Sequence, residues 1–270
     1  MDAARSSRVF VFFLLASLVG GMQPATANEP VFAAYSRLLE RHVAPGVLDG
    51  LETHLVDYHA WAADPDYPIA LQALAKAELP PTASDPEKIA FWINAYNLLA
   101  IKVVLDRYPM ESIRDGGNFL FPIWKKTAGT VGGVERSLDT IEHEILRGQF
   151  PEPRVHMGLV CASLSCPDLR REVYQGGSLD QQLDDQSRRF LANRGKGLLP
   201  GEDPDEAEVS SIFRWFRGDF DAEGGVAKWI QAHAGPETRA KVQGLENRGI
   251  SYLNYNWTLN DQARLRARGQ

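Results

Sequence analysis

The stretch HMGLVCASLSCPDL, residues 156–169, contains both cysteines of this chain. Cys161 and Cys166 lie five residues apart, and His156 precedes Cys161 by the same distance. Two thiols and an imidazole at this spacing can form a disulfide, bind a metal ion, or supply a nucleophile and its base. The sequence therefore offers three kinds of chemistry within one short loop.

A disulfide between Cys161 and Cys166 is favoured by the even number of cysteines, provided that the protein works in an oxidising compartment. The bridge would close a very small loop, so its entropic stabilisation would be modest. It would also require a turn at residues 162–165. A thiol–disulfide oxidoreductase has less support, because the C-x-x-C spacing of that class is absent.

A metal site could use His156, Cys161 and Cys166, with Asp168 as a further ligand. Zinc sites usually take two cysteines separated by two to four residues, and a second pair closes the tetrahedron. The separation here is at the edge of that range, and the sequence has no second pair. The sequence therefore predicts neither a metal nor another cofactor.

A thiol nucleophile needs a base and a third group that orients the base. The histidines of the chain are His42, His54, His59, His143, His156 and His233. His143 is the best candidate base, because it lies on a predicted helix beside Glu142 and Glu144. The candidate site is therefore Cys161 as nucleophile and His143 as base, with Glu142 or Asn94 as a supporting group.

His156 is a further candidate, on a segment that the sequence predicts to be a strand, residues 154–160. Side chains alternate along a strand, so His156 and Val160 share one face and Cys161 points to the other. In a flat strand His156 would not meet Cys161, although a bulge or the following loop could bring them together.

The most informative predicted element is a helix that starts near Asp85, which can cap it, with Pro86 in the first turn. Its apolar side chains leave almost no polar face, which is typical of a buried helix. Asn94 and Asn97 lie three residues apart on one side. They either bridge neighbouring backbone groups, or Asn94 supports a polar cleft.

The remaining patterns predict a mainly helical α+β fold with a small antiparallel sheet. Gly132-Gly133 indicates a turn between two short strands, and Ser137 can cap a helix that ends near Gly148. Further helices are expected at residues 30–43, 68–79, 178–194 and 224–234, a strand followed by a helix at 208–220, and a strand at 250–260. Trp215, Phe216 and Phe220 are expected to be core anchors.

The N-terminus has the pattern of a signal peptide over residues 1–27. A basic start precedes an apolar run of about 13 residues, which is short of the roughly 18 needed to cross a bilayer. We therefore expect an exported protein, periplasmic or secreted, with no membrane span after signal cleavage. The net charge of −6 and the lack of basic clusters argue against nucleic acid as a partner, which leaves a small molecule or a peptide.

The chain divides, on these patterns, into the signal peptide at 1–27, a helical segment at 28–84, a core at 85–260 and a C-terminal tail at 261–270. No linker rich in proline, glycine or serine separates these parts.

Five segments together resemble the family called domain of unknown function 547. They are FWINAYNLL (91–99), SLDTIEHEILRG (137–148), RVHMGLVCASLSCPDL (154–169), IFRWFRGDF (212–220) and YNWTLN (255–260). In plant members a cysteine stands at the place of Cys161, and a serine tends to stand at that of Cys166. The resemblance thus implies a role for Cys161 without a disulfide, and it places the family's histidine at His143. At the level of architecture, a buried helix followed by a small sheet with a histidine is similar to papain and transglutaminase-like enzymes.

Two functions remain open. The first is a thiol-dependent hydrolase or acyl-transfer enzyme that uses Cys161 and His143. The alternative is a non-catalytic periplasmic binding or interaction domain with a structural Cys161–Cys166 disulfide.

Overall fold

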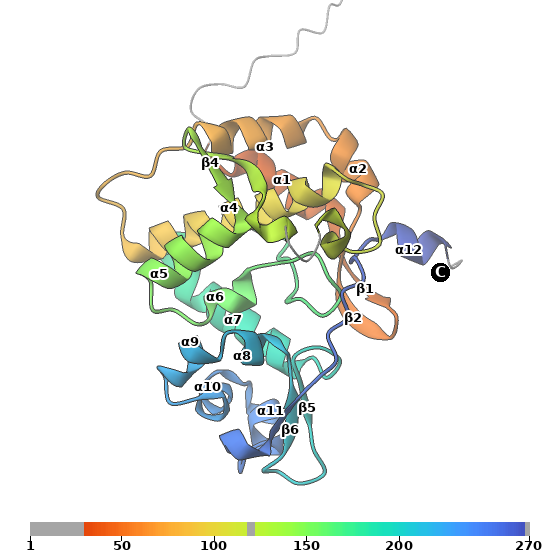
Figure 1. The fold of residues 1–270 in the computed structure, drawn as a ribbon, viewed down its shortest axis with the longest axis vertical. Helices are drawn as coiled ribbons and strands as arrows, with labels where there is room; N and C mark the ends of the chain where they lie inside the picture. Colours follow the sequence, from red (N-terminus) through yellow and green to blue (C-terminus); the bar gives the residue numbers. More distant parts are fainter. Residues whose placement is uncertain (1–29, 118–121, 268–270) are drawn as a thin grey trace, which may run out of the picture.

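Helices predominate in the computed structural model of the protein, which describes residues 30–117 and 122–267 (Figure 1). The longer helices are α1 (Ala33–His42), α3 (Asp66–Ala75), α4 (Asp85–Leu105), α7 (Leu179–Ala192) and α10 (Val226–His233). The shorter ones are α2 (Tyr58–Ala63), α5 (Arg147–Gln149), α6 (Val155–Gly158), α8 (Ile212–Trp215), α9 (Arg217–Asp221), α11 (Pro236–Lys241) and α12 (Ala263–Ala267). A π-helix, η3 (Thr140–Leu146), and four 3-10 turns, η1 (Ile113–Gly116), η2 (Ile123–Lys125), η4 (Gly176–Ser178) and η5 (Asn247–Gly249), complete the helical elements of these residues. The predicted α+β class is confirmed, whereas the predicted signal peptide at 1–27 lies outside the described residues.

Short strands form three small sheets in the part of the chain that the structure describes. The strands are β1 (Val43–Leu48), β2 (Leu51–Val56), β3 (Thr127–Val131), β4 (Val134–Ser137), β5 (Leu198–Pro200), β6 (Ala207–Val209) and β7 (Ile250–Tyr252). The pairs β1–β2, β3–β4 and β5–β6 are antiparallel, as predicted, but β6 and β7 pair in parallel. The expected Gly132-Gly133 turn is confirmed, with φ of +57° and +78°, and it joins β3 to β4.

The helix α4 forms the centre of the larger hydrophobic core. Ser84, not Asp85, is its N-cap, because Ser84 and Glu87 form a capping box. By length and composition α4 could cross a membrane, but 78% of its most apolar stretch is buried within the protein. Its apolar residues therefore serve packing, as the sequence predicted.

The N-terminal helices pack on α4 in the same core, through side chains such as Leu38 and Trp61. The hairpin β1–β2 also belongs to this part of the chain. Val56 of β2 donates a backbone hydrogen bond to Asn260 (2.9 Å) and accepts one from Gln262 (2.9 Å). Figure 1 shows the C-terminal segment running back past the lower half of the molecule to reach α12 beside this hairpin. The helices α1, α2 and α3 thus share one core with α4.

One predicted strand is wrong, and another is shorter than predicted. Residues 154–160 contain the single helical turn α6 followed by extended chain, because the side chain of Asn97, rather than a neighbouring strand, pairs with that backbone. Of residues 250–260 only Ile250–Tyr252 form a strand, since β6 pairs with no more than these three. Phe220 is buried as expected, but Trp215 is 43% exposed and is no core anchor.

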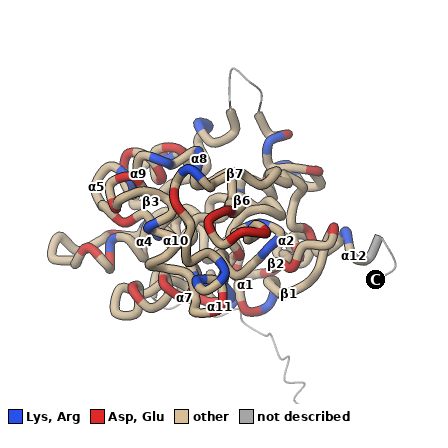
Figure 2. The backbone as a smooth tube through the Cα atoms, turned by 90° about the horizontal axis from the view of Figure 1, so that it is seen from below, with Lys and Arg blue, Asp and Glu red and all other residues tan. Residues whose placement is uncertain are grey.

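A second hydrophobic core lies below α4 in Figure 1, around α8, α9 and α10. Its largest members include Phe213, Phe220 and Trp229. Basic and acidic residues are interspersed along the backbone (Figure 2). Their numbers are close, with 29 Lys plus Arg and 35 Asp plus Glu. The boundary between the two cores is where the predicted site residues meet.

Candidate thiol site

A cleft of about 420 Å³ lies where the two cores meet. Four of the five predicted site residues line it, namely Glu142, His143, His156 and Cys161. They come from η3, α6 and the loop that follows α6, and α8 supplies the opposite wall. The fifth predicted residue, Asn94, is not among the residues that line the cleft.

The sulfur of Cys161 is surrounded by hydroxyl groups. The Ser163 hydroxyl lies 3.1 Å from Cys161 Sγ, and the Tyr255 hydroxyl lies 3.3 Å from it. A hydrogen bond from the Cys166 thiol, aided by those from Ser163 and Tyr255, lowers the pKa of the Cys161 thiol well below its usual range. The thiolate is thus the favoured form near neutral pH, and it faces the cleft.

Both cysteines are free thiols in the structure. Cys166 is buried, and its sulfur accepts the backbone N–H of Cys161 at 2.9 Å. Burial raises the pKa of the Cys166 thiol, so it stays protonated and can donate toward the carbonyl of Leu159 (3.8 Å) or toward Cys161. The two cysteines therefore differ in charge although they lie in contact.

The backbone beside Cys161 is strained. Ala162 has a φ of +61°, a left-handed conformation that costs a non-glycine residue about 1–2 kcal/mol. The carbonyl of Ala162 accepts the N–H of Asn260 (3.0 Å), which holds the residue in this conformation. Strained residues of this kind gather at functional sites, because the surrounding structure must hold them in place.

Asn97 fixes the chain that leads into Cys161. Its amide donates to the carbonyl of Gly158 (2.9 Å) and accepts the N–H of Val160 (2.9 Å). Asn94 makes the same pair of bonds with the backbone of Tyr174, at 2.8 and 2.9 Å. The interpretation that both amides bridge neighbouring backbone is thus confirmed, and Asn97 is the one next to the thiol.

Replacing Asn97 with alanine is expected to lower the free energy of unfolding by about 2–5 kcal/mol, because two buried backbone groups lose their partners. The change should also slow alkylation of Cys161 by iodoacetamide, since the thiol is no longer fixed. Asn94→Ala is the matched control, with a similar loss of stability in urea denaturation but an unchanged alkylation rate. Equal effects of both variants on alkylation would show that Asn97 does not position Cys161.

Glu142 is a half-buried carboxyl group at the cleft. Tyr96 of α4 donates a hydrogen bond to its Oε2 at 3.1 Å. Burial raises the pKa of Glu142 to about 7; the bond from Tyr96 opposes this shift, and the negative charge of Cys161 adds to it. Glu142 can therefore give or accept a proton near neutral pH, a property that its sequence position did not reveal.

A Glu142→Gln variant is expected to be more stable than the wild type by about 1–3 kcal/mol at about pH 8, and equally stable at about pH 4. The pKa of Glu142 is raised in the folded state, so wild-type stability is lost as the pH rises from the ordinary glutamate range to about 7. Glutamine stays neutral and can still accept from Tyr96. Urea denaturation at both pH values measures the difference. A gain that is the same at both would contradict the raised pKa.

His143 lies at the exposed rim of the cleft, and its ring is held by a cation. Arg147 donates from Nη1 to His143 Nδ1 at 2.8 Å, so a neutral ring carries its proton on Nε2, which faces Asp139 at 3.6 Å. Partial burial, with the charge of Arg147, lowers the pKa of His143. Among the described residues no hydrogen bond joins Cys161 to a histidine. His143 therefore shares the cleft with Cys161 but is not paired with it.

His156 is buried, and it faces the same cleft as Cys161, contrary to the alternation expected of a strand. Its Nε2 donates to Asp219 of α9 at 2.7 Å, and its ring stacks on Phe216 with centroids 4.0 Å apart. Asp219 also accepts two bonds from Arg147, at 2.6 and 2.9 Å. The role of His156 in the structure is thus to join the two cores, and the pair fixes Arg147 beside His143.

Three aromatic residues that sequence reasoning did not place in the site form one wall of it. Trp215, Tyr255 and Trp257 lie with ring centroids 4.6–5.6 Å apart. Tyr255 and Trp257 belong to the segment YNWTLN, which was singled out but interpreted as a strand. These residues reach the cleft only through the tertiary fold. The only sequence signal for their role was that aromatic residues cluster with asparagine in this segment.

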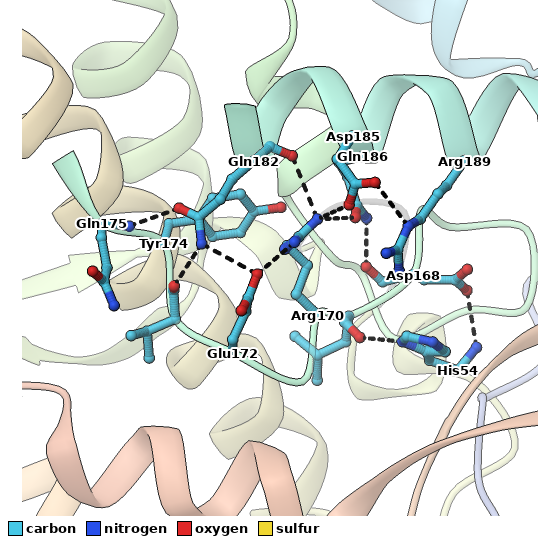
Figure 3. Close-up of polar contacts among 12 residues, drawn as sticks. His54, Asp168, Arg170, Glu172, Tyr174, Gln175, Gln182, Asp185, Gln186 and Arg189 are labelled. Carbon is cyan, nitrogen blue, oxygen red and sulfur yellow. Dashed lines mark hydrogen bonds and ion pairs between the residues drawn. The ribbon is translucent and has the colours of Figure 1, made fainter. Parts of the chain in front are cut away.

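The chain after Cys166 is anchored to α7 by a polar network (Figure 3). Arg170 donates to Asp185 (2.6 Å) and Glu172 (2.5 Å), and Gln186 donates to the carbonyl of Asp168 (2.6 Å). The carboxylate of Asp168 accepts from the buried Lys196 at 2.5 Å. Asp168 therefore points away from the thiols, and within residues 30–117 and 122–267 no cluster of three His, Cys, Asp or Glu residues could hold a metal ion.

The chain was compared with protein families, curated proteins and solved structures. Residues 80–191 match the family model described as "Protein of unknown function, DUF547", which confirms the resemblance. No curated protein and no solved structure matches the chain. The matched range includes Asn97, Glu142, His143 and Cys161 but ends before Tyr255.

Proposed function

Residues 80–191 of this chain match the DUF547 family model, and on that premise we propose that the cleft is the active site of a thiol-dependent hydrolase or acyltransferase. Cys161 is the nucleophile. The observation that carries the proposal is the setting of Cys161 Sγ, at the cleft with two hydroxyl groups within 3.3 Å and a thiol donor behind it. A structural cysteine would be buried in apolar surroundings, which keep a thiol protonated and inert.

The hydroxyl of Tyr255 supports the thiolate from the cleft side. A Tyr255→Phe variant is expected to alkylate about 3- to 10-fold more slowly near neutral pH, because loss of one hydrogen bond raises the pKa of Cys161. Tyr252→Phe is the control, since its ring contacts Arg214 instead. The rate of iodoacetamide labelling against pH measures the shift. A Tyr255→Phe profile that overlays the wild type would remove Tyr255 from the proposal.

Glu142 is the group that we propose to move the proton in this reaction. Its pKa of about 7 divides it between acid and base at neutral pH, and it lines the same cleft as Cys161. His143 is less suited, because its acceptor nitrogen is occupied by Arg147. We therefore assign His143 and Arg147 to the binding of substrate at the rim, and His143 as base becomes the alternative that variants test.

The reaction then has two balanced steps. The Cys161 thiolate attacks the carbonyl carbon of an ester, thioester or amide; the bond to the leaving group breaks, and that group takes the proton of Glu142. An acyl-thioester remains on Cys161. The Glu142 carboxylate next removes a proton from water or from an acceptor, whose attack on the thioester carbon releases the acyl product and the thiolate.

Two further parts of the proposal concern the compartment in which the protein works and its architecture. The protein works outside the cytoplasm, on a small molecule or peptide, if residues 1–27 are removed as a signal peptide. Its architecture, with α4 packed against β3 and η3 following β4, resembles that of papain and transglutaminase-like enzymes only in outline. Those enzymes place a cysteine near the start of the central helix, whereas Cys161 follows α6.

The test is to trap the acyl-enzyme. The full mature protein is mixed with p-nitrophenyl acetate, quenched in acid and digested, and the peptide with Cys161 is expected to gain one acetyl group that hydroxylamine removes. An acetyl group on lysine or serine alone would overturn the proposal. A native protein in which Cys161 and Cys166 are bridged, and which forms no acyl-enzyme after reduction, would instead favour a non-catalytic binding domain.

A further inference from the structure

The two cysteines are held against each other by a tight turn. The N–H of Cys166 donates to the carbonyl of Ser163 (3.1 Å), which brings Cys166 back over the start of the loop. Its sulfur then accepts the N–H of Cys161 at 2.9 Å, and its thiol donates toward the carbonyl of Leu159 at 3.8 Å. A second thiol is therefore in contact with the proposed nucleophile before any ligand arrives.

The C-terminal segment clamps this loop in place. Leu164 donates to the carbonyl of Thr258 (2.9 Å), and Ser165 donates to that of Asn256 (3.2 Å). The Ser165 hydroxyl also accepts the N–H of Asn256 at 2.8 Å. Because three bonds fix the residues between the two cysteines, the approach of the sulfurs is a built feature of the fold.

Exposure to the cleft differs between the two sulfurs. Cys161 is partly exposed at the cleft, whereas Cys166 is only 3% exposed. The pKa of Cys161 is lowered and that of Cys166 is raised, so the accessible sulfur is also the more nucleophilic one. Both cysteines line the cleft, but a small oxidant that enters it meets the more exposed Cys161 first.

We propose that Cys161 is a site of reversible oxidation by hydroperoxides, with Cys166 as the resolving thiol. This goes beyond acyl transfer and does not require it, since a peroxide needs only the thiolate. Cys166 thereby has a function beyond its packing in the core and its support of the Cys161 thiolate.

The chemistry uses two steps. The Cys161 thiolate attacks one peroxide oxygen, the O–O bond breaks, and the other oxygen leaves as hydroxide or alkoxide, which gives a sulfenic acid. Cys166 sulfur then attacks the Cys161 sulfur; the S–O bond breaks, the S–S bond forms, and the departing oxygen takes the Cys166 proton and leaves as water. The two thiols supply the two electrons that reduce the peroxide, and an external dithiol restores them.

The disulfide has a clear consequence for the proposed enzyme. It removes the nucleophile, so acyl transfer stops while the bridge lasts. It also takes the sulfenic acid away before a second peroxide can convert it to sulfinic acid, which is not reversible by thiols. Cys161 is thus inactivated reversibly, as a disulfide, and not irreversibly, as a sulfinic acid.

The experiment treats the reduced full mature protein with hydrogen peroxide and follows intact mass, with dimedone present to capture sulfenic acid. The wild type is expected to lose two hydrogens, to form little dimedone adduct, and to regain its mass in dithiothreitol. Cys166→Ser should accumulate the dimedone adduct, and sulfinic acid without dimedone. Cys161→Ser should stay unchanged, because Cys166 is shielded.

Three results would overturn the proposal: a wild type that gains oxygen at Cys161 without forming the bridge, a wild type that does not react, or a bridge that dithiothreitol cannot reduce. The wild-type measurement alone decides this, even if a variant folds poorly. Failure here leaves the acetyl group on Cys161 untouched as a separate test, so the two proposals can fail independently.

Discussion

Replacing Cys161 with alanine is expected to reduce turnover of p-nitrophenyl acetate by about 10³-fold or more, because loss of a nucleophile removes the covalent route altogether. No acyl-enzyme should form on this variant. Steady-state release of p-nitrophenol measures the effect. The free energy of unfolding should change by no more than about 1 kcal/mol, since the side chain is small and partly exposed.

Cys166→Ser is the matched control for this prediction. Serine nearly preserves the volume and keeps a donor toward Cys161, so turnover should fall less than tenfold. If Cys161→Ala retains wild-type turnover, the thiol-dependent function is wrong. If both variants lose all turnover, then turnover depends on the conformation of the whole loop and not specifically on the Cys161 thiol.

Replacing Glu142 with glutamine is expected to lower turnover by about 10²- to 10⁴-fold, the usual contribution of a general acid–base group. Glutamine keeps the contact with Tyr96 but cannot carry a proton. The acylation rate of the wild type should also change near pH 7, where Glu142 titrates, and the variant should lack that change. Stopped-flow measurement of the first turnover against pH reports both effects.

Glu144→Gln and His143→Gln are the controls for Glu142. Glu144 is exposed on the same π-helix, so its replacement should change turnover less than twofold. His143→Gln should lower turnover by less than about tenfold, since the ring is held by Arg147 rather than by Cys161. A larger loss for His143→Gln than for Glu142→Gln would return the role of base to His143, as the sequence first indicated.

Several features of the fold are local, and the sequence predicted them for that reason. The apolar run from Ile89 to Val104 predicts a buried helix, because its apolar side chains leave almost no polar face. Gly132-Gly133 defines a hairpin through its own φ angles. The same rule applies to Asp49-Gly50, with φ of +53° and +76°, so the β1–β2 hairpin was predictable although it was overlooked.

The candidate site, too, could be predicted only in part from the sequence. Residue type alone pointed to Cys161, because the chain has only two thiols and one lies where a strand or helix enters a loop. Pairing could not be predicted, since it depends on contacts between residues far apart in the chain. Asn94 and Asn97 look alike in sequence, yet only Asn97 meets the segment before Cys161.

By itself, then, the sequence determined the fold class, the central helix and the thiol. The tertiary structure alone decided which groups surround that thiol. Tyr255 reaches Cys161 across 94 residues, and Asp219 reaches His156 across 63. The burial that raises the pKa of Glu142 is likewise a property of the packed cleft, because desolvation depends on every neighbour in space and not on neighbours in the chain.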